Sequence, residues 1–361
     1  ERFSQLEEQL ATIDSKSPVE TILSQMTARQ KVLQLISFPV VLSDSEASVS
    51  AEVAWVQQNQ PGFVTLFGSG LTASEVASFS AEVINPTGSY SPLIAVDHEG
   101  GTVQRLRGSG FTILPSWRQE CATPSADRLA LFAKSASELA AAGVQIVFAP
   151  VLDVAQAGSF LGTRACQDGE QAVAAATDYI TSFGQYGILP VIKHFPGIGS
   201  ITNDLHFEQD VVDLTPEDTA PFNTILSAFP NVGVMTTHVA VENRTNGVPC
   251  SLSATCLEVF PTNFPNALLF TDALEMASAA GQTGQAEPQS LPVVAVQAVT
   301  AGNDVLVFGE RVNATTIETV INAVTAKYTN DKTFAEKVDA SARKILMLKL
   351  PAPEETTDAA Q

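Results

Sequence analysis

The four histidines of the chain all lie in short segments that also contain a carboxylate, a lysine or a glycine pair. The densest segment begins with Lys193 and His194 and ends with Asp204 and His206. Histidine is the side chain whose unperturbed pKa lies closest to neutrality. An aspartate two residues from a histidine can accept the Nδ1 proton and leave Nε2 to exchange a proton with a substrate. The clustering therefore predicts a catalytic site that uses acid–base chemistry.

Two further segments carry charged groups beside features that would position them. Asp97 and Arg105 flank the glycine pair at 100–101, where the backbone can turn sharply or approach a ligand closely. Asp272 ends the apolar run 268–271. A carboxylate at the end of a buried strand costs desolvation free energy unless a partner or a function compensates. The alternative is a purely structural role, in which Asp272 only caps the helix that follows.

A zinc site is the rival interpretation of the histidine clusters, because neutral imidazoles and carboxylates bind zinc. The sequence has no His-x-x-x-His spacing and no cysteine pairing that suits zinc. It also has no P-loop and no Gly-x-Gly-x-x-Gly after a strand, so nucleotide chemistry has little support. We expect neither a metal nor a cofactor.

The elements that would position these residues form an alternating series. Short β-branched apolar runs recur between Ala-rich amphipathic stretches, as expected for parallel strands joined by crossover helices. The predicted strands are residues 32–40, 62–67, 93–97, 145–151, 189–194, 233–238, 267–272 and 304–308. Asp97, Asp153, His194, His238 and Asp272 each end or closely follow one of them. This placement predicts an α/β fold of the (β/α)8 TIM-barrel type, whose reactive groups lie at the carboxyl ends of the strands; the alternative is an open, doubly wound sheet.

Helix signals divide the chain further. Capping patterns predict helices that begin near residues 17–20, 72–75 and 215–216. The Ala-rich stretch 127–142 is predicted to end at Gly143, and residues 331–349 to form a closing helix. We therefore expect an N-terminal extension at 1–17, a single barrel domain at 18–350 and an acidic C-terminal tail at 351–361.

Composition limits the partners of the chain. Its 361 residues can form one barrel or two ordinary domains. The net charge of −20 argues against a nucleic acid or an anionic membrane as partner, because no basic surface would displace counterions from phosphates. No apolar stretch approaches the roughly 20 residues that span a bilayer. We expect a soluble protein that acts on a small or neutral substrate.

Four cysteines favour an oxidising environment. Cys250 and Cys256 are close enough to bridge a short loop, and Cys121 and Cys166 could form a second pair. Four cysteines nevertheless allow three connectivities, which the sequence does not distinguish. The N-glycosylation patterns at 243–245 and 313–315 matter only for an exported chain. Secretion is the expected localisation, with a cytoplasmic location as the alternative.

With these residues assembled, the chain resembles glycoside hydrolase family 3, specifically its single-barrel β-N-acetylglucosaminidase branch. The resemblance extends from residue 26 to residue 304, most of the chain. Its landmarks are five segments that contain the residues discussed above: 97–101, 148–154, 193–197, 235–238 and 271–276.

The resemblance implies roles for eight residues. Asp272 matches the nucleophile, which would attack the anomeric carbon and form a covalent glycosyl-enzyme. Asp204 and His206 match a dyad on a mobile loop, in which His206 would protonate the departing oxygen and then activate water. The dyad would replace the second carboxylate that most retaining glycosidases use. The positions that would hold the hydroxyls and the acetamido group of the sugar are Asp97, Arg105, Arg164, Lys193 and His194.

The resemblance therefore implies a retaining exo-β-N-acetylglucosaminidase that acts, as a monomer, on a small saccharide such as a chitin oligosaccharide or a peptidoglycan fragment. A β-glucosidase or other glycosidase of the same family is one alternative, and a catalytically inactive carbohydrate-binding relative is another. Transfer of the sugar to phosphate instead of water also stays open, because a neutral imidazole does not repel an anionic acceptor.

Three departures from the family pattern lie in the loops expected to contact substrate. Ile198 and Ser200 stand where the branch has His and Asp. Ala165 and Cys166 replace the usual Ser-Phe, and His98 replaces the usual Gln. We expect these changes to affect specificity and rate more than mechanism.

Overall fold

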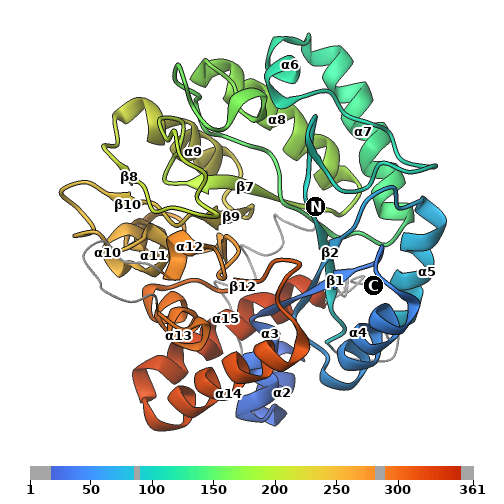
Figure 1. The fold of residues 1–361 in the computed structure, drawn as a ribbon, viewed down its shortest axis with the longest axis vertical. Helices are drawn as coiled ribbons and strands as arrows, with labels where there is room; N and C mark the ends of the chain where they lie inside the picture. The colour runs from blue at the N-terminus through green and yellow to red at the C-terminus, as the bar shows by residue number, and fades with distance from the viewer. Residues whose placement is uncertain (1–17, 85–89, 281–288, 351–361) are drawn as a thin grey trace, which may run out of the picture.

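The computed structural model of the chain describes residues 18–84, 90–280 and 289–350. The predicted extension at 1–17 and the predicted acidic tail at 351–361 lie outside these residues. Within the described part, the structure is α/β, and it consists of a ring of parallel strands surrounded by helices (Figure 1).

Eight parallel strands form the ring, in the spatial order β11-β9-β7-β6-β3-β2-β1-β12. Their bounds are β1 Ile36–Val41, β2 Phe63–Phe67, β3 Leu93–Val96, β6 Ile146–Val147, β7 Leu189–Phe195, β9 Gly233–Thr236, β11 Leu268–Thr271 and β12 Leu306–Val307. The ring closes where Phe270 on β11 bridges in parallel to Val305, just before β12. Each strand thus neighbours the next one along the chain, which is the topology of a (β/α)8 barrel and excludes the open sheet.

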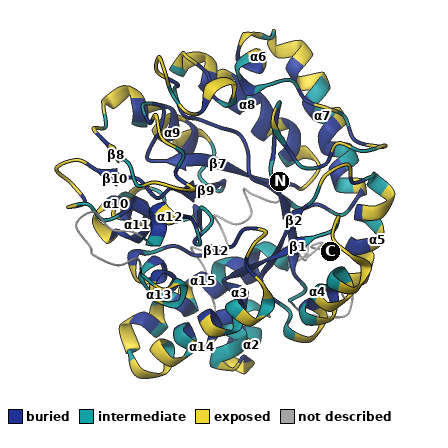
Figure 2. Cartoon of the chain, in the orientation of Figure 1, coloured by how far each residue is buried: buried dark blue, intermediate teal, exposed yellow. Residues whose placement is uncertain are grey.

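Helices cover the outside of the barrel. Those between or after barrel strands are α4 Glu46–Asn59, α5 Ala73–Val83, α7 Ser125–Ala141, α8 Gly169–Gln185, α9 Pro216–Ala228, α10 Ala254–Leu257, α11 Val259–Asn263, α13 Leu291–Ala301, α14 Ala314–Asn330 and α15 Lys332–Lys349. Two helices precede the first strand, α2 Pro18–Gln25 and α3 Ala28–Gln34, and α6 Trp117–Ala122 and α12 Ala277–Ala280 lie within connections. Figure 2 shows the barrel strands almost entirely buried and the outer helix surfaces exposed.

Short elements at the rim complete the connections. The hairpin of β4 His98–Gly100 and β5 Val103–Gln104 follows β3, and the 3-10 turns are η1 Gly162–Arg164 and η2 Cys250–Leu252. A second small sheet pairs β8 Val211–Val212 with β10 Ala240–Val241. Gly100 and Gly101 have φ angles of +92° and +56°, so the glycine pair makes the turn that the sequence predicted.

The helix signals are confirmed at several positions. The Thr72 backbone N–H donates to the Glu75 carboxylate and the Glu75 backbone N–H donates to the Thr72 hydroxyl oxygen, which forms the predicted capping box of α5. Helix α9 begins at Pro216 behind a capping box made by Thr215 and Asp218. The chain leaves α7 through Gly143, with φ +88°.

The first predicted strand is wrong at its start. Residues 32–34 belong to α3, and β1 begins only at Ile36. The capping box of Thr27 and Gln30 starts this helix, and Val32 and Leu33 are buried on it. An apolar run does not by itself distinguish a buried helix from a buried strand, so the prediction joined the end of α3 and the whole of β1 into one strand.

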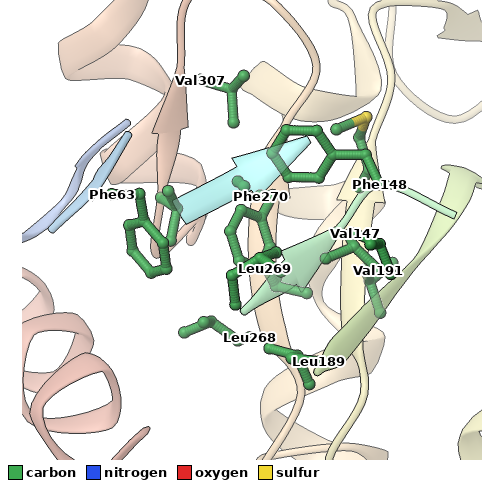
Figure 3. Packing of buried hydrophobic residues seen from close by; sticks show 14 of the residues in the cluster. Phe63, Val147, Phe148, Leu189, Val191, Leu268, Leu269, Phe270 and Val307 are labelled. Atoms are coloured by element: carbon green, nitrogen blue, oxygen red, sulfur yellow. The ribbon is translucent and has the colours of Figure 1, made fainter. Parts of the chain in front are cut away.

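Large apolar side chains fill the barrel interior. Phe270 on β11 lies between Phe63 on β2 and Phe148, with ring centroids 5.4 and 5.8 Å apart and edge-to-face geometry (Figure 3). All three side chains are buried. Edge-to-face contacts are a favourable arrangement for aromatic pairs. The interior is therefore a packed core, and the residues predicted for the site lie at or beyond the carboxyl ends of the strands.

Two disulfides select one of the three possible connectivities. Cys121 on α6 pairs with Cys166, with Cα atoms 6.0 Å apart, and we call this the long-range disulfide. Cys250 pairs with Cys256, with Cα atoms 5.2 Å apart, and we call this the short-range disulfide. In the described part of the chain, no helix has the length and apolar character that crossing a bilayer requires.

Candidate active site

A cavity of about 380 Å³ opens at the carboxyl ends of the barrel strands. All eight residues predicted for the site line it: Asp97, Arg105, Arg164, Lys193, His194, Asp204, His206 and Asp272. They come from the segments after β3, β5, β7 and β11, from β7 itself and from η1. The structure therefore brings together every predicted site residue, although they span 176 residues of sequence from Asp97 to Asp272, counting both.

A buried carboxylate that carried no role in the sequence prediction organises one wall. Glu99, only 1% exposed, accepts hydrogen bonds from Arg164 at both oxygens, at 2.8 and 2.9 Å. Its Oε1 also lies 2.7 Å from Nζ of Lys193. Lys193 donates a second hydrogen bond of 2.9 Å to Asp97, which lies 3.7 Å from Nε of Arg105. Two anions and three cations thus hold each other in fixed positions at the cavity wall.

Charge determines the ionisation of this wall. Burial alone would raise the pKa of Glu99, but Lys193 and Arg164 lower it to about 2. Burial would likewise lower the pKa of Lys193, but the carboxylates of Asp97 and Glu99 hold it above its ordinary value. Glu99 and Lys193 are therefore charged at neutral pH, and they hold the polar groups of this wall in place.

His194 is oriented by Asp153, which is fully buried behind it. Oδ2 of Asp153 lies 2.7 Å from Nδ1 of His194 and accepts its backbone N–H at 3.0 Å. Oδ1 accepts the backbone N–H of Ile198 at 2.8 Å. A carboxylate on Nδ1 leaves Nε2 as the free ring nitrogen. Asp153 therefore fixes both the imidazole and the start of the loop after β7.

Asp272 lies directly after β11, with His194, His238 and Lys193 as electrostatic neighbours. Its carboxylate accepts the N–H of Ala273 at 2.8 Å, and its own N–H donates to the Thr236 carbonyl at 2.8 Å. Burial would raise its pKa, but the charges of His194 and His238 and the Ala273 hydrogen bond hold the pKa of Asp272 below its ordinary value. Asp272 is thus an anion at neutral pH and could act as a nucleophile.

Asp204 and His206 form a hydrogen-bonded pair at the cavity mouth. Oδ1 of Asp204 lies 2.7 Å from Nδ1 of His206 and accepts its backbone N–H at 3.0 Å. Burial would raise the pKa of Asp204, but these two hydrogen bonds hold it below its ordinary value. An ionised Asp204 accepts the Nδ1 proton, so Nε2 is the nitrogen that can exchange a proton.

The other two histidines, His98 and His238, do not line the cavity. His98 is fully buried, its Nε2 lies 2.8 Å from the Ser135 hydroxyl, and burial lowers its pKa to about 3. His238 is buried between Ser251, 2.6 Å from its Nδ1, and the Ala273 carbonyl, 3.1 Å from its Nε2. It positions the residue after Asp272 and so belongs to the support of the site.

Three further cavity residues carried no predicted role. Glu275 is a partly buried carboxyl whose Oε2 has no hydrogen-bond partner among the described residues, and burial raises its pKa. Phe160 and Phe207 line the mouth. The one sequence signal for Phe207 is its position next to His206, and Glu275 was visible only as part of the segment after β11.

The departures from the family pattern have clear positions. Ile198 is buried and lines the cavity, and its backbone N–H binds Asp153 whatever its side chain. Ala165 is buried, and Cys166 forms the long-range disulfide two residues after Arg164. Ser200 lies at the start of the loop that leads to Asp204 and lines no part of the cavity.

The donor set of the site suits covalent chemistry on a neutral polar ligand. The described residues contain no group of three or more His, Cys, Asp and Glu side chains that could hold a metal ion. They do place an anionic carboxylate and an Asp-supported imidazole in one cavity. One of these groups can attack an electrophilic carbon while the other transfers a proton.

Comparisons with known proteins show which family of proteins the chain is similar to. The model of the glycosyl hydrolase family 3 N-terminal domain matches residues 27–348. A β-hexosaminidase of Tolumonas auensis is 31% identical over 279 residues, which cover 74% of this chain and 81% of the relative.

Solved structures of similar proteins cover nearly the whole described chain. A β-N-acetylhexosaminidase from Beutenbergia cavernae is 26% identical, with a TM-score of 0.77 over 90% of this chain and 99% of that one. LpqI of Mycobacterium tuberculosis is 25% identical, with a TM-score of 0.80 over 93% and 98%. The similarity therefore extends to the complete barrel.

Proposed function

The chain belongs to glycosyl hydrolase family 3, and from this membership we propose that it is a retaining exo-β-N-acetylglucosaminidase. The β-hexosaminidase names of its relatives support the substrate class. The observation that carries the mechanism is the presence of anionic Asp272 and the Asp204–His206 dyad in one cavity. The substrate is a small saccharide that ends in β-linked N-acetylglucosamine.

In the first step, a carboxylate oxygen of Asp272 attacks the anomeric carbon of the terminal sugar. The bond from that carbon to the leaving oxygen breaks, and Nε2 of His206 gives its proton to this oxygen. Asp204 stabilises the imidazolium from which the proton departs. The products of this step are the free leaving sugar and a glycosyl ester on Asp272.

In the second step, water enters on the same side as the departed sugar. His206, now neutral, takes a proton from the water while the water oxygen attacks the anomeric carbon. The ester bond breaks and its electron pair returns to Asp272. The two displacements together retain the configuration at the anomeric carbon. The charged wall of Asp97, Lys193 and Arg164, with His194 and Arg105, binds the hydroxyls and the acetamido group throughout.

The first test compares chromogenic β-N-acetylglucosaminide and β-glucoside substrates, with wild type and Asp272→Ala. We expect a strong preference for the acetamido sugar and loss of turnover in the variant. Asp331→Asn is a matched control, because Asp331 caps α15 outside the cavity and asparagine caps helices equally well. A preference for the glucoside would replace the proposed specificity, and inactivity of the wild type on both would favour a binding protein.

The role of the dyad needs a substrate with a poor leaving group. His206→Ala should lower kcat/KM for an unactivated disaccharide by roughly 10²- to 10⁴-fold, because proton transfer contributes about that much. The first step with an activated aryl glycoside should lose far less. Full activity of His206→Ala on the disaccharide would show that His206 is not the acid. Rates and products with and without phosphate distinguish hydrolysis from phosphorolysis.

We also propose that the protein acts as a monomer outside the cytoplasm. The two disulfides support export, because disulfides persist in oxidising compartments. All eight residues proposed to act belong to the same chain, so the proposed reaction requires no residue from a second copy. Fractionation of the source cells and light scattering of the purified protein test these two statements.

A further inference from the structure

Two exposed aromatic side chains stand at the mouth of the cavity. Phe207 is 69% exposed and Phe160 is 41% exposed, and both line the cavity. A single exposed apolar side chain is ordinary on a protein surface, but aromatic rings beside convergent polar groups are typical of ligand sites. Their position therefore calls for a ligand that covers them.

Both rings are held by one backbone framework. The Phe160 N–H donates to the carbonyl of Ile201 at 2.8 Å, which joins its segment to the loop after β7. The Phe207 N–H donates to the carbonyl of Asp204 at 3.0 Å within the same loop. Leu161, Ile201 and Leu205 are buried beneath this part of the mouth. The two rings thus belong to a supported surface and not to free chain.

The position of Phe207 identifies which part of a substrate it meets. It directly follows His206, whose Nε2 donates the proton to the leaving oxygen in the proposed function. In the proposed function the terminal sugar lies against the charged wall, beside Asp272 and Lys193. The unit attached to the leaving oxygen therefore extends towards the mouth. The leaving unit, and not the terminal sugar, therefore lies next to the rings.

We propose that Phe160 and Phe207 form a leaving-group subsite that binds a neutral pyranose ring of a β-linked oligosaccharide. One face of a pyranose carries C–H groups, which pack on the negatively charged face of an aromatic ring. A neutral ring fits better than an anionic one, because the lining apart from the charged wall contains Asp204 and Glu310 against Arg311, which leaves no net positive charge for an anionic ring, and the chain carries a net charge of −20. This inference rests on the proposed function and extends it to the second sugar.

The test uses two substrates with the same terminal N-acetylglucosamine and alcohol leaving groups. One is the methyl β-glycoside and the other is the β-1,4 disaccharide of N-acetylglucosamine. The change in the ratio of their kcat/KM values from wild type to variant reports contacts with the second ring, because the difference in leaving-group acidity is the same in both proteins. Covering about 50 Å² of apolar ring corresponds to about tenfold in kcat/KM. Phe207→Ala and Phe160→Ala should each lower the disaccharide-to-methyl ratio by about this factor.

Two further variants make the result specific. Phe207→Tyr keeps the aromatic face and should keep the ratio. Tyr186→Ala removes an aromatic side chain that is 44% exposed and outside the cavity, and it should change neither the ratio nor the activity. Circular dichroism confirms that each variant is folded.

The outcomes separate this inference from the proposed function. A ratio that stays within twofold of wild type in both alanine variants overturns the subsite while the acetamidoglucosidase activity stands. A wild type that prefers a disaccharide with a carboxylate on the leaving sugar overturns the assignment of a neutral ring. A wild type that cleaves neither substrate overturns the proposed function and this inference with it.

Discussion

Replacing Glu99 by glutamine removes one negative charge from the cavity wall and keeps the shape of the side chain. In the native protein Glu99 accepts three contacts from cations, two from Arg164 and one from Lys193. The glutamine amide nitrogen is a donor, so it faces a cationic donor in place of an acceptor. Of its two carboxylate partners, Lys193 then retains only Asp97, and Arg164 no longer forms two hydrogen bonds with one carboxylate.

The expected loss of stability can be estimated from the pKa of Glu99. Lys193 and Arg164 lower it from the ordinary 4.5 to about 2, and at roughly 1.36 kcal/mol per pKa unit this corresponds to about 3 kcal/mol. Removing one partner of a buried ion pair generally costs roughly 3–5 kcal/mol. Because Glu99 is almost fully buried, solvent screening reduces this value little. Glu99→Gln should therefore lower the free energy of unfolding by about 3 kcal/mol at pH 7.

The pH dependence has a definite sign. A carboxyl whose folded pKa is depressed stabilises the protein above its unfolded pKa, and this contribution is lost as the pH falls towards the folded pKa. The difference between wild type and Glu99→Gln should stay constant from pH 8 to about 5 and shrink between about 4.5 and 2. Urea unfolding followed by circular dichroism at a series of pH values measures it.

Activity provides a second measurement on the same variant. Without the Glu99 carboxylate, the guanidinium of Arg164 is no longer held in one orientation. Misplacement of a substrate-positioning group by about 1 Å can cost about 10²-fold in rate. Glu336→Gln, which changes an exposed glutamate, should stay within about 0.5 kcal/mol of wild type. If the free energy of unfolding of Glu99→Gln stays within about 0.5 kcal/mol of wild type and its kcat/KM is unchanged, the buried wall does not have the energetic role assigned to it.

Two other perturbations follow from the same structure. Cys121→Ala opens the long-range disulfide, whose sequence separation of 45 residues corresponds to about 4 kcal/mol of unfolding free energy. It should also lower kcat/KM because Arg164 lies two residues from Cys166, whereas Cys250→Ala opens a separation of 6 residues and should cost about 2 kcal/mol in urea unfolding with little effect on kcat/KM. Glu275 has a raised folded pKa, so its contribution to stability is present below its ordinary pKa of 4.5 and is lost as the pH rises through the folded value. Glu275→Gln should therefore raise the urea midpoint at pH 8 relative to wild type and leave it nearly unchanged at pH 4, and an equal shift at both pH values would contradict the assignment.

The strand pattern of the sequence was sufficient to predict the barrel. Each buried parallel strand is a short, continuous β-branched run, and that signal is local. It failed at residues 32–34 for a local reason, because the apolar end of α3 continues into β1 without a turn residue between them. The capping box of Thr27 and Gln30 was a signal in the sequence that would have corrected the boundary.

That residues on strand ends would line one cavity was also predictable, because the barrel brings all carboxyl ends to one face. This rule located Asp97, Lys193, His194 and Asp272. It could not reveal that Glu99 pairs with a guanidinium 65 residues away, since that contact depends on how two loops fold over the barrel. The buried residues that hold the cavity-lining side chains could therefore be identified only from the three-dimensional structure.

The dyad shows which feature of a loop the spacing of residues can predict and which feature depends on the fold. The loop after β7 is joined to the segment after β11 by two backbone hydrogen bonds of 3.3 Å, from Ala277 to the His206 carbonyl and from Ser278 to the Leu205 carbonyl. Asp272 begins the second segment, so the group proposed to attack and the group proposed to transfer the proton share one hydrogen-bonded unit. Spacing within the sequence gave the Asp204–His206 pair, but only this unit relates the pair to Asp272. A change at Ala277 or Ser278 that shifts the loop would thus alter the reaction without touching either reacting side chain.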